Sequence, residues 1–150
     1  VIEQRGSSVV ALCDFVERTF PFSGWTPVLR VETCMARLRR KKTRALAPHD
    51  VALGERFSSC VVPAQTLVAY EHKLQLLGAS EDSPREVILA ERSPNGEISL
   101  EIASEGLAAI VSAIGEGALP KTQVLAILAA HTDEPDSVFL DLLADGLLVA

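Results

Sequence analysis

Residues 86–102 read EVILAERSPNGEISLEI and carry the clearest local pattern in the chain. In the second half of this segment Ile98, Leu100 and Ile102 alternate with polar residues, as in a strand that has one apolar face. Between the two halves stands Asn95-Gly96, the pair that best tolerates the positive φ values of a type I′ turn. The segment therefore predicts an antiparallel β-hairpin.

Three helical segments are expected after the hairpin. Ser104 is a suitable N-cap for the first of them. The second begins at Pro120 or Thr122, and the third ends at Gly146. The apolar run 147–149 predicts a short terminal strand beside the hairpin. A hairpin with three short helices is typical of a winged-helix-like domain.

Upstream of the hairpin, alternating apolar residues in segment 67–76 predict another strand. Two helices are expected before it. The first runs from Ser8 and stops at Pro21, and the second has Thr26 as its N-cap and Pro27 at its first helical position. Each helix has an apolar stripe, which predicts that the two pack together as a helical hairpin.

The expected fold class is therefore α+β, with two parts. Residues 1–63 form the N-terminal helical hairpin segment with a basic loop, and residues 64–150 form the winged-helix-like domain. Pro48 and Gly54 mark the stretch 45–54 as a loop. A chain of 150 residues can bury about 70% of its unfolded surface, so it needs no disulfide or metal to fold.

Composition excludes two further classes of protein. The chain is 48% hydrophobic, which excludes intrinsic disorder. Its longest stretch without a charged residue, 57–70, is shorter than the roughly 20 apolar residues of a membrane-spanning helix. The cysteines Cys13, Cys34 and Cys60 are odd in number and lack CxxC spacing. We therefore expect reduced, buried cysteines in a cytoplasmic protein.

Charge is distributed unevenly along the chain. Residues 1–75 hold 11 Lys/Arg and 7 Asp/Glu, whereas residues 76–150 hold 3 and 13. A basic cluster occupies the expected end of the second helix: Arg37, Arg39, Arg40, Lys41, Lys42 and Arg44. This cluster suits a phosphate or an acidic protein surface, but cations at a helix C-terminus are also favoured by the helix dipole alone. A third interpretation is that it docks on the acidic half of this chain or of a second copy.

No catalytic, cofactor or metal site is predicted. His49, His72 and His131 form no pair at the i, i+3 or i, i+4 spacing of short metal motifs. The GxSxG, Walker and GxGxxG strings do not occur, so nucleophile-elbow and nucleotide chemistry have no support. His131-Thr132-Asp133 matches the HxD pattern of an iron site, but no histidine follows it. We interpret it as a chance match and expect that the chain itself is not catalytic.

Several features of the chain occur together in known modules. They are the Arg-rich helix end 35–44, the strand 67–76, the hairpin 86–102, the apolar stripe 107–114 and the ending 142–149. From Thr66 to Ala150 the chain resembles the C-terminal winged-helix domain of bacterial JmjC/cupin-type protein hydroxylases. From Arg85 onward it is also similar to the PqqD-like peptide-recognition domain. The first resemblance implies a non-catalytic region that pairs two subunits and helps frame a substrate protein, with the iron chemistry in another part of the parent protein.

We therefore expect a protein-interaction module that acts in dimerisation, in recognition of a protein or peptide, or in both. The edge of the hairpin would accept a peptide strand, with Val87 or Leu89 lining a pocket. Glu97 and Glu101 on the exposed face would favour a basic partner. A homodimer is the expected assembly, and a membrane is not an expected partner.

The alternative is a winged-helix DNA-binding transcriptional regulator. Its recognition helix would have to lie against phosphates, and nonspecific affinity comes from Lys and Arg. The expected helices between residues 107 and 150 hold one Lys, no Arg and six acidic residues. The negative charge of this region repels a nucleic-acid backbone, so only the basic cluster supports the DNA-binding alternative.

Overall fold

The computed structural model describes residues 11–150 except 13, 16–17, 20–23, 44 and 81. The described residues between 11 and 19 are helical. The elements that follow are α2 (Thr26–Arg40), β1 (Asp50–Leu53), β2 (Phe57–Pro63), α3 (Thr66–Glu71), β3 (Arg85–Arg92), β4 (Ile98–Ile102), α4 (Glu105–Ile114), β5 (Leu119–Pro120), α5 (Lys121–Ala129), α6 (Pro135–Ala144) and β6 (Leu148–Val149). The α+β class is confirmed, and the described strands form two antiparallel three-stranded sheets, β2-β3-β4 and β5-β1-β6.

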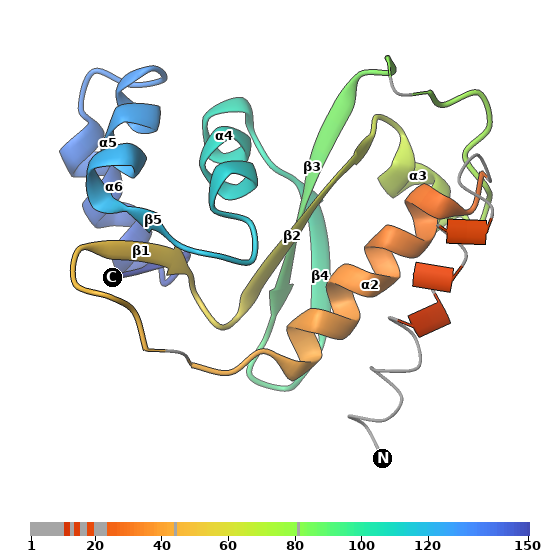
Figure 1. The fold of residues 1–150 in the computed structure, drawn as a ribbon, viewed down its shortest axis with the longest axis horizontal. Coiled ribbons are helices and arrows are strands. Elements are labelled where there is room, and N and C mark those ends of the chain that lie inside the picture. Colours follow the sequence, from red (N-terminus) through yellow and green to blue (C-terminus); the bar gives the residue numbers. More distant parts are fainter. Residues whose placement is uncertain (1–10, 13, 16–17, 20–23, 44, 81) are drawn as a thin grey trace.

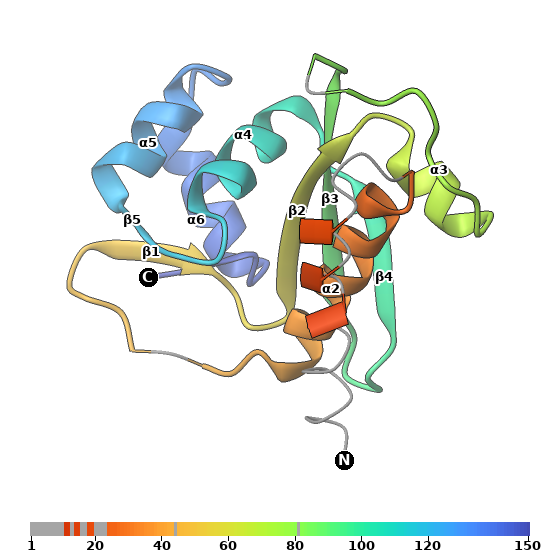
Figure 2. The ribbon, with the colours of Figure 1, turned by 45° about the vertical axis from the view of Figure 1, so that its right-hand side comes forward.

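The larger sheet separates two layers of helices. Helices α2 and α3 lie on one side of it and α4 on the other, with α5 and α6 beyond α4 (Figures 1 and 2). The buried side chains Val31 and Leu38 of α2 pack on Ile88 and Ala90 of β3. Val31 and Leu38 are seven residues apart, which is two turns along one face of the helix, so the apolar stripe of α2 lies on the sheet.

The central strand β3 is buried on both faces. Ile88 and Ala90 face α2, whereas Val87 and Leu89 belong to the larger core cluster with residues of α4, α5 and α6. A strand covered on both faces has a continuous apolar run instead of an alternating one. Segment 87–90 shows such a run, in contrast to the alternating β4.

Strand β1 lies inside the stretch that was expected to be a loop. It joins β5 on one side and β6 on the other, with only two residue pairs to each. Next to it, the N–H of Gly54 donates to the carbonyl oxygen of Leu147 at 2.8 Å. The terminal strand therefore exists but pairs with β1, and its predicted place beside the hairpin is wrong.

The hairpin 86–102 and the three helices after it are confirmed, but the turn differs from the prediction. The N–H of Gly96 donates to Ser93 O at 2.9 Å, and Gly96 has φ +87° while Asn95 does not have positive φ. A type I′ turn needs positive φ at both central residues, and Pro94 is fixed near −65°. The loop therefore has three residues and ends on a left-handed glycine.

The predicted strand 67–76 is wrong, because Thr66–Glu71 is helical. The buried residues Thr66, Leu67 and Ala69 have the spacing of one helix face, and Val68 between them is 47% exposed. The strand that pairs with β3 lies earlier, at Phe57–Pro63. Its proline ends the strand, and the chain turns into α3 through Gln65, which has φ +75°.

The predicted division of the chain at residues 63 and 64 is crossed by both sheets. β2 pairs with β3 over its whole length, and β1 pairs with β5 and β6. The stripe of the first predicted helix falls largely outside the described residues, so its packing against α2 stays a prediction, as does the winged-helix arrangement. Within the described part of the chain, no helix has the length and apolar composition needed to cross a membrane.

Candidate functional site

The outer edge of β4 offers unpaired backbone groups. Among the described residues β4 pairs only with β3. The N–H of Ala103 donates to Val87 O at 2.9 Å, and the N–H of Ser93 donates to Glu97 O at 2.8 Å. With the register of the two strands, these bonds show that odd-numbered residues of β4 bond to β3. Backbone groups alternate in direction along a strand, so those of the even-numbered residues point outward.

Three residues carry these outward groups: Ile98, Leu100 and Ile102. Their side chains lie on the α2 side of the sheet, where Ile98 and Leu100 are half-buried and pack against the cluster around Cys34 and Leu38. Ile102 is 51% exposed. The edge therefore combines three pairs of backbone donors and acceptors with a row of apolar side chains.

The opposite edge of the sheet, on β2, is less accessible to a strand. The same reasoning from the register makes its odd-numbered residues face outward. Phe57 O already accepts a hydrogen bond from Lys41 Nζ at 2.6 Å. Pro63 has no N–H to donate. Only Ser59 and Val61 remain between them, so β4 is the edge that fits an added strand.

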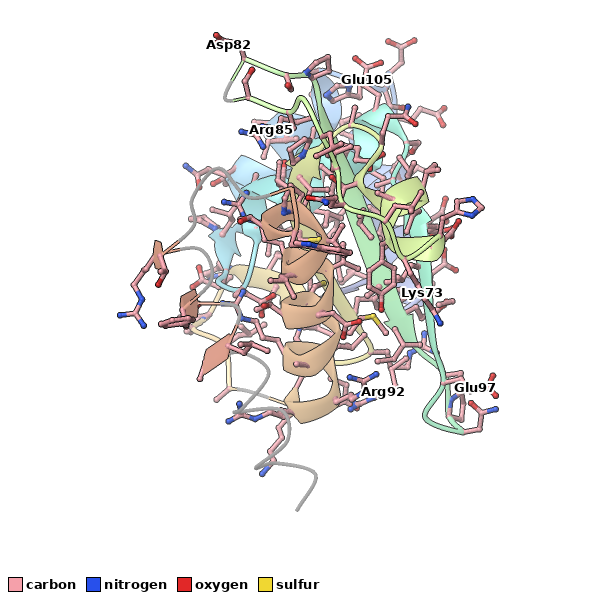
Figure 3. The ribbon with its side chains drawn as sticks, turned by 90° about the vertical axis from the view of Figure 1, so that its right-hand side faces the viewer. Lys73, Asp82, Arg85, Arg92, Glu97 and Glu105 are labelled. Atoms are coloured by element: carbon pink, nitrogen blue, oxygen red, sulfur yellow. The ribbon has the colours of Figure 1, made fainter. Side chains whose placement is uncertain are left out.

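The face of β4 that points away from α2 is acidic. Ser99 and Glu101 are exposed there, and Glu91 of β3 stands beside Ser99 in the register. Glu97 lies at the tip of the hairpin, away from α2 (Figure 3). A strand added to this edge would meet isoleucine and leucine on one face and carboxylates on the other.

The structure brings together only part of the predicted partner site. Glu97 and Glu101 lie along the β4 edge, as the hairpin pattern predicts. Val87 and Leu89 do not line a surface pocket, because both are buried in the core on the central strand, at 9% and 3% exposure. The apolar residues at the open edge are instead those of β4, which the same alternating pattern already displays.

The described residues of the basic cluster lie at the end of α2 and in the chain that follows it. Arg37, Arg39 and Arg40 lie in the last turn of α2. Lys41 reaches the carbonyl of Phe57, as described above, and Lys42 lines a hollow on the side of the loop 41–49. Arg37 lines a different hollow, next to the cysteines. Arg44 lies outside the described residues.

That second hollow has a volume of about 290 Å³ and opens beside β2. Cys34 of α2 and Cys60 of β2 both line it, and they are not joined in a disulfide. Cys34 is buried at 2% exposure and Cys60 is half-buried, so the expectation of buried cysteines is confirmed for Cys34 and in part for Cys60, and their reduced state stays a prediction. Cys13 lies outside the described residues. The spacing of 34 and 60 forms no motif, and only the packing of α2 on β2 brings them together.

The two thiols differ in acidity. The hydrogen bond from Cys60 is the main reason why the pKa of Cys34 lies below its ordinary value, and Ser58 and Arg37 act in the same direction. Burial and the carboxylate of Glu116 oppose this shift. The pKa of Cys60 is raised, because its proton is held in the hydrogen bond to Cys34 and because burial disfavours its charged form.

A larger hollow of about 700 Å³ lies between the loop 41–49 and the end of the chain. Lys42, His49, Glu55 and Arg56 line it, so it carries both signs of charge. None of the three histidines belongs to a possible metal site: over the described residues, no group of three or more His, Cys, Asp or Glu side chains is placed to hold an ion.

The chain has no match among known proteins in three comparisons. No protein-family model matches it, and neither a curated protein nor a solved structure does.

Proposed function

We propose that this chain is a non-catalytic protein-interaction module that binds an extended basic peptide at the outer edge of β4. The observation that carries this proposal is the set of backbone groups of Ile98, Leu100 and Ile102, which point away from β3. An exposed strand edge of this kind takes up a further strand through main-chain hydrogen bonds, and side-chain pockets then give specificity.

The side chains around this edge define the chemistry of the peptide. In an antiparallel pair, directly opposite residues point to the same face. Residues opposite Leu100 would thus lie beside apolar side chains, and residues opposite Ser99 and Glu101 would lie beside carboxylates. The partner that fits is a strand that alternates apolar with basic residues.

Charge favours such a peptide over the two other occupants considered for this module. A second copy of β4 would bring two acidic faces together, and like charges across a strand pair are destabilising. A nucleic acid at this edge would meet the same carboxylates, which repel its phosphates. The further step, that the module is an accessory region of a larger oxygenase, rests on the resemblance alone.

The test uses a fluorescent heptapeptide in which valine alternates with lysine or arginine. N-methylation of the valine amides removes the N–H groups that would bond to β4, whereas N-methylation of the basic residues removes N–H groups that point to solvent. Fluorescence anisotropy should show binding weakened about tenfold or more by the first change and little altered by the second.

An equal loss of affinity with either methylated peptide would refute strand addition, since only every second peptide N–H group should bond to β4. A random DNA duplex that binds more tightly than the peptide at the same salt concentration would favour the regulator instead. Sedimentation of the chain alone reports on the homodimer: a dimer that the peptide dissociates would show that a second copy occupies the same edge.

A further inference from the structure

Two thiols meet where α2 packs on β2. Cys34 and Cys60 line the same hollow, and each belongs to or packs against the same small apolar cluster. Cys34 Sγ lies 3.5 Å from Ser58 Oγ, and Ser58 donates to Glu116 Oε1 at 3.0 Å. When Cys34 is ionised, the Ser58 hydroxyl can turn and donate to its sulfur instead.

This arrangement assigns different roles to the two sulfurs. The thiolate is the reactive form of cysteine, and hydrogen-bond donors and nearby cations favour it. The hydroxyl of Ser58, which accepts a hydrogen bond from the Cys34 thiol, is placed to donate to the thiolate, and the guanidinium of Arg37 lines the same hollow. The pKa of Cys60 is raised by its interaction with Cys34 and by burial, which favours its thiol form. Cys34 is thus the sulfur that attacks an oxidant first, and Cys60 is in contact to attack second.

The hollow gives a small oxidant a way to the sulfurs. Its volume of about 290 Å³ is several times the roughly 30 Å³ that a water molecule occupies. Cys34 is buried as a residue, but it lines this hollow together with Cys60, Arg30 and Thr33. A molecule the size of hydrogen peroxide fits there, whereas a folded protein partner does not.

We infer that Cys34 and Cys60 form a dithiol oxidation site, which hydrogen peroxide converts into an intramolecular disulfide. The thiolate of Cys34 attacks one peroxide oxygen, the O–O bond breaks, and the hydroxide released takes up a proton to give water. Cys34 is then a sulfenic acid. Cys60 Sγ attacks Cys34 Sγ, the S–O bond breaks, and the departing hydroxide takes the proton of Cys60 as a second water. The two thiols lose two electrons, which reduce the peroxide.

The test uses the whole chain with C13S, so that only the two thiols of the site remain. After exposure to hydrogen peroxide, intact mass should fall by two hydrogen atoms, both thiols should be lost together, and dithiothreitol should restore them. With C60S added, Cys34 should instead be trapped as a sulfenic acid by dimedone. With C34S added, Cys60 should stay unreacted under the same conditions.

A charge variant tests whether the site, rather than general exposure, sets the rate. R37Q should slow disulfide formation by roughly two- to fivefold, because it removes a cation beside Cys34. R39Q is the matched control, since Arg39 carries the same charge on the same helix but does not line the hollow. Its rate should equal that of the parent. Circular dichroism confirms that each variant is folded before it is compared.

Three results would overturn the inference. The first is a folded protein whose thiols both survive peroxide that oxidises free cysteine. The second is a disulfide formed only between chains. The third is a Cys60 that reacts as readily as Cys34 when each is alone. None of these outcomes bears on peptide binding at β4, so this inference and the proposed function can fail separately.

Discussion

Gly54→Ala tests the least predictable contact of the fold, where β1 meets the end of the chain. A Cβ at residue 54 would lie 2.0 Å from the carbonyl oxygen of Gly146, far inside the 3.0 Å that real contacts respect. The backbone must therefore move by about 1 Å or more, and the 2.8 Å bond from Gly54 N–H to Leu147 O would be lost with it. Overpacking and one lost buried hydrogen bond together cost about 2–4 kcal/mol in the free energy of unfolding.

Urea unfolding followed by circular dichroism measures this loss. With an m-value of about 2 kcal/mol/M, the midpoint should fall by about 1–2 M. Gly117→Ala is the control, because the nearest atom to its added Cβ is Ile114 O at 3.6 Å, an ordinary contact. It should change stability by no more than about 0.5 kcal/mol. If G54A unfolded at the midpoint of the parent protein, the two strands could not approach each other as described.

Three more substitutions probe the edge and the packing of α2. Glu101→Lys should weaken binding of the alternating valine-basic peptide about three- to tenfold at low salt, and added salt should reduce this difference in affinity. D141K is the matched control, because Asp141 is exposed on α6, away from the sheet edge, and this variant should bind the peptide as the parent does. Arg92→Gln should lower the free energy of unfolding in urea by about 1 kcal/mol, because Nη1 of Arg92 donates to the carbonyl oxygens of Leu38 and Arg39 at 3.1 and 3.3 Å. R85Q is the control, since Arg85 is exposed, and it should cost almost nothing. Burial and a hydrogen bond to a carboxylate raise the pKa of Tyr70, so the folded chain holds this proton more tightly than the unfolded chain does. The stability it contributes is present below about pH 10 and is lost as pH rises further, and Y70F should therefore show the smaller decline in a urea midpoint series at alkaline pH.

Local signals predicted the C-terminal elements well. Asn95-Gly96 lies in the hairpin loop, Ser104 stands at the N-cap position of α4 without a side-chain capping hydrogen bond, and Gly146 follows α6 with positive φ. These local signals locate the hairpin and the helices after it. The exact turn type depended on Pro94, which the Asn-Gly signal by itself does not take into account.

The remaining strands depend on distant partners and left no such signal. β2 reads FSSCVVP, and the fully buried Ser58 interrupts its apolar run. A serine can be buried there because it donates a hydrogen bond to Glu116, which lies 58 residues further along the chain. β1 has four residues that pair with residues 119–120 and 148–149. The candidate site was also predicted only in part. Alternation located the acidic face of β4, but β3 can be identified as the central strand only when the position of β2 is known. That placement moves Val87 and Leu89 from the surface to the core.

The thiol site and the peptide edge share one apolar cluster, which leads to a joint prediction. Cys34 and Leu38 of α2 pack there with Ala90, and Ile98 and Leu100 of β4 pack against the same group. A disulfide from Cys34 to β2 would fix α2 on the sheet and so stiffen the strand that receives the peptide. A strand that is already rigid loses less conformational entropy when the peptide binds. The oxidised C13S protein should therefore bind the alternating peptide up to a few-fold more tightly than the reduced form, and this gain in affinity should vanish when C34S is added. Equal affinity in both states, measured by anisotropy on protein of verified mass, would show that the edge is already rigid and that the two sites act independently.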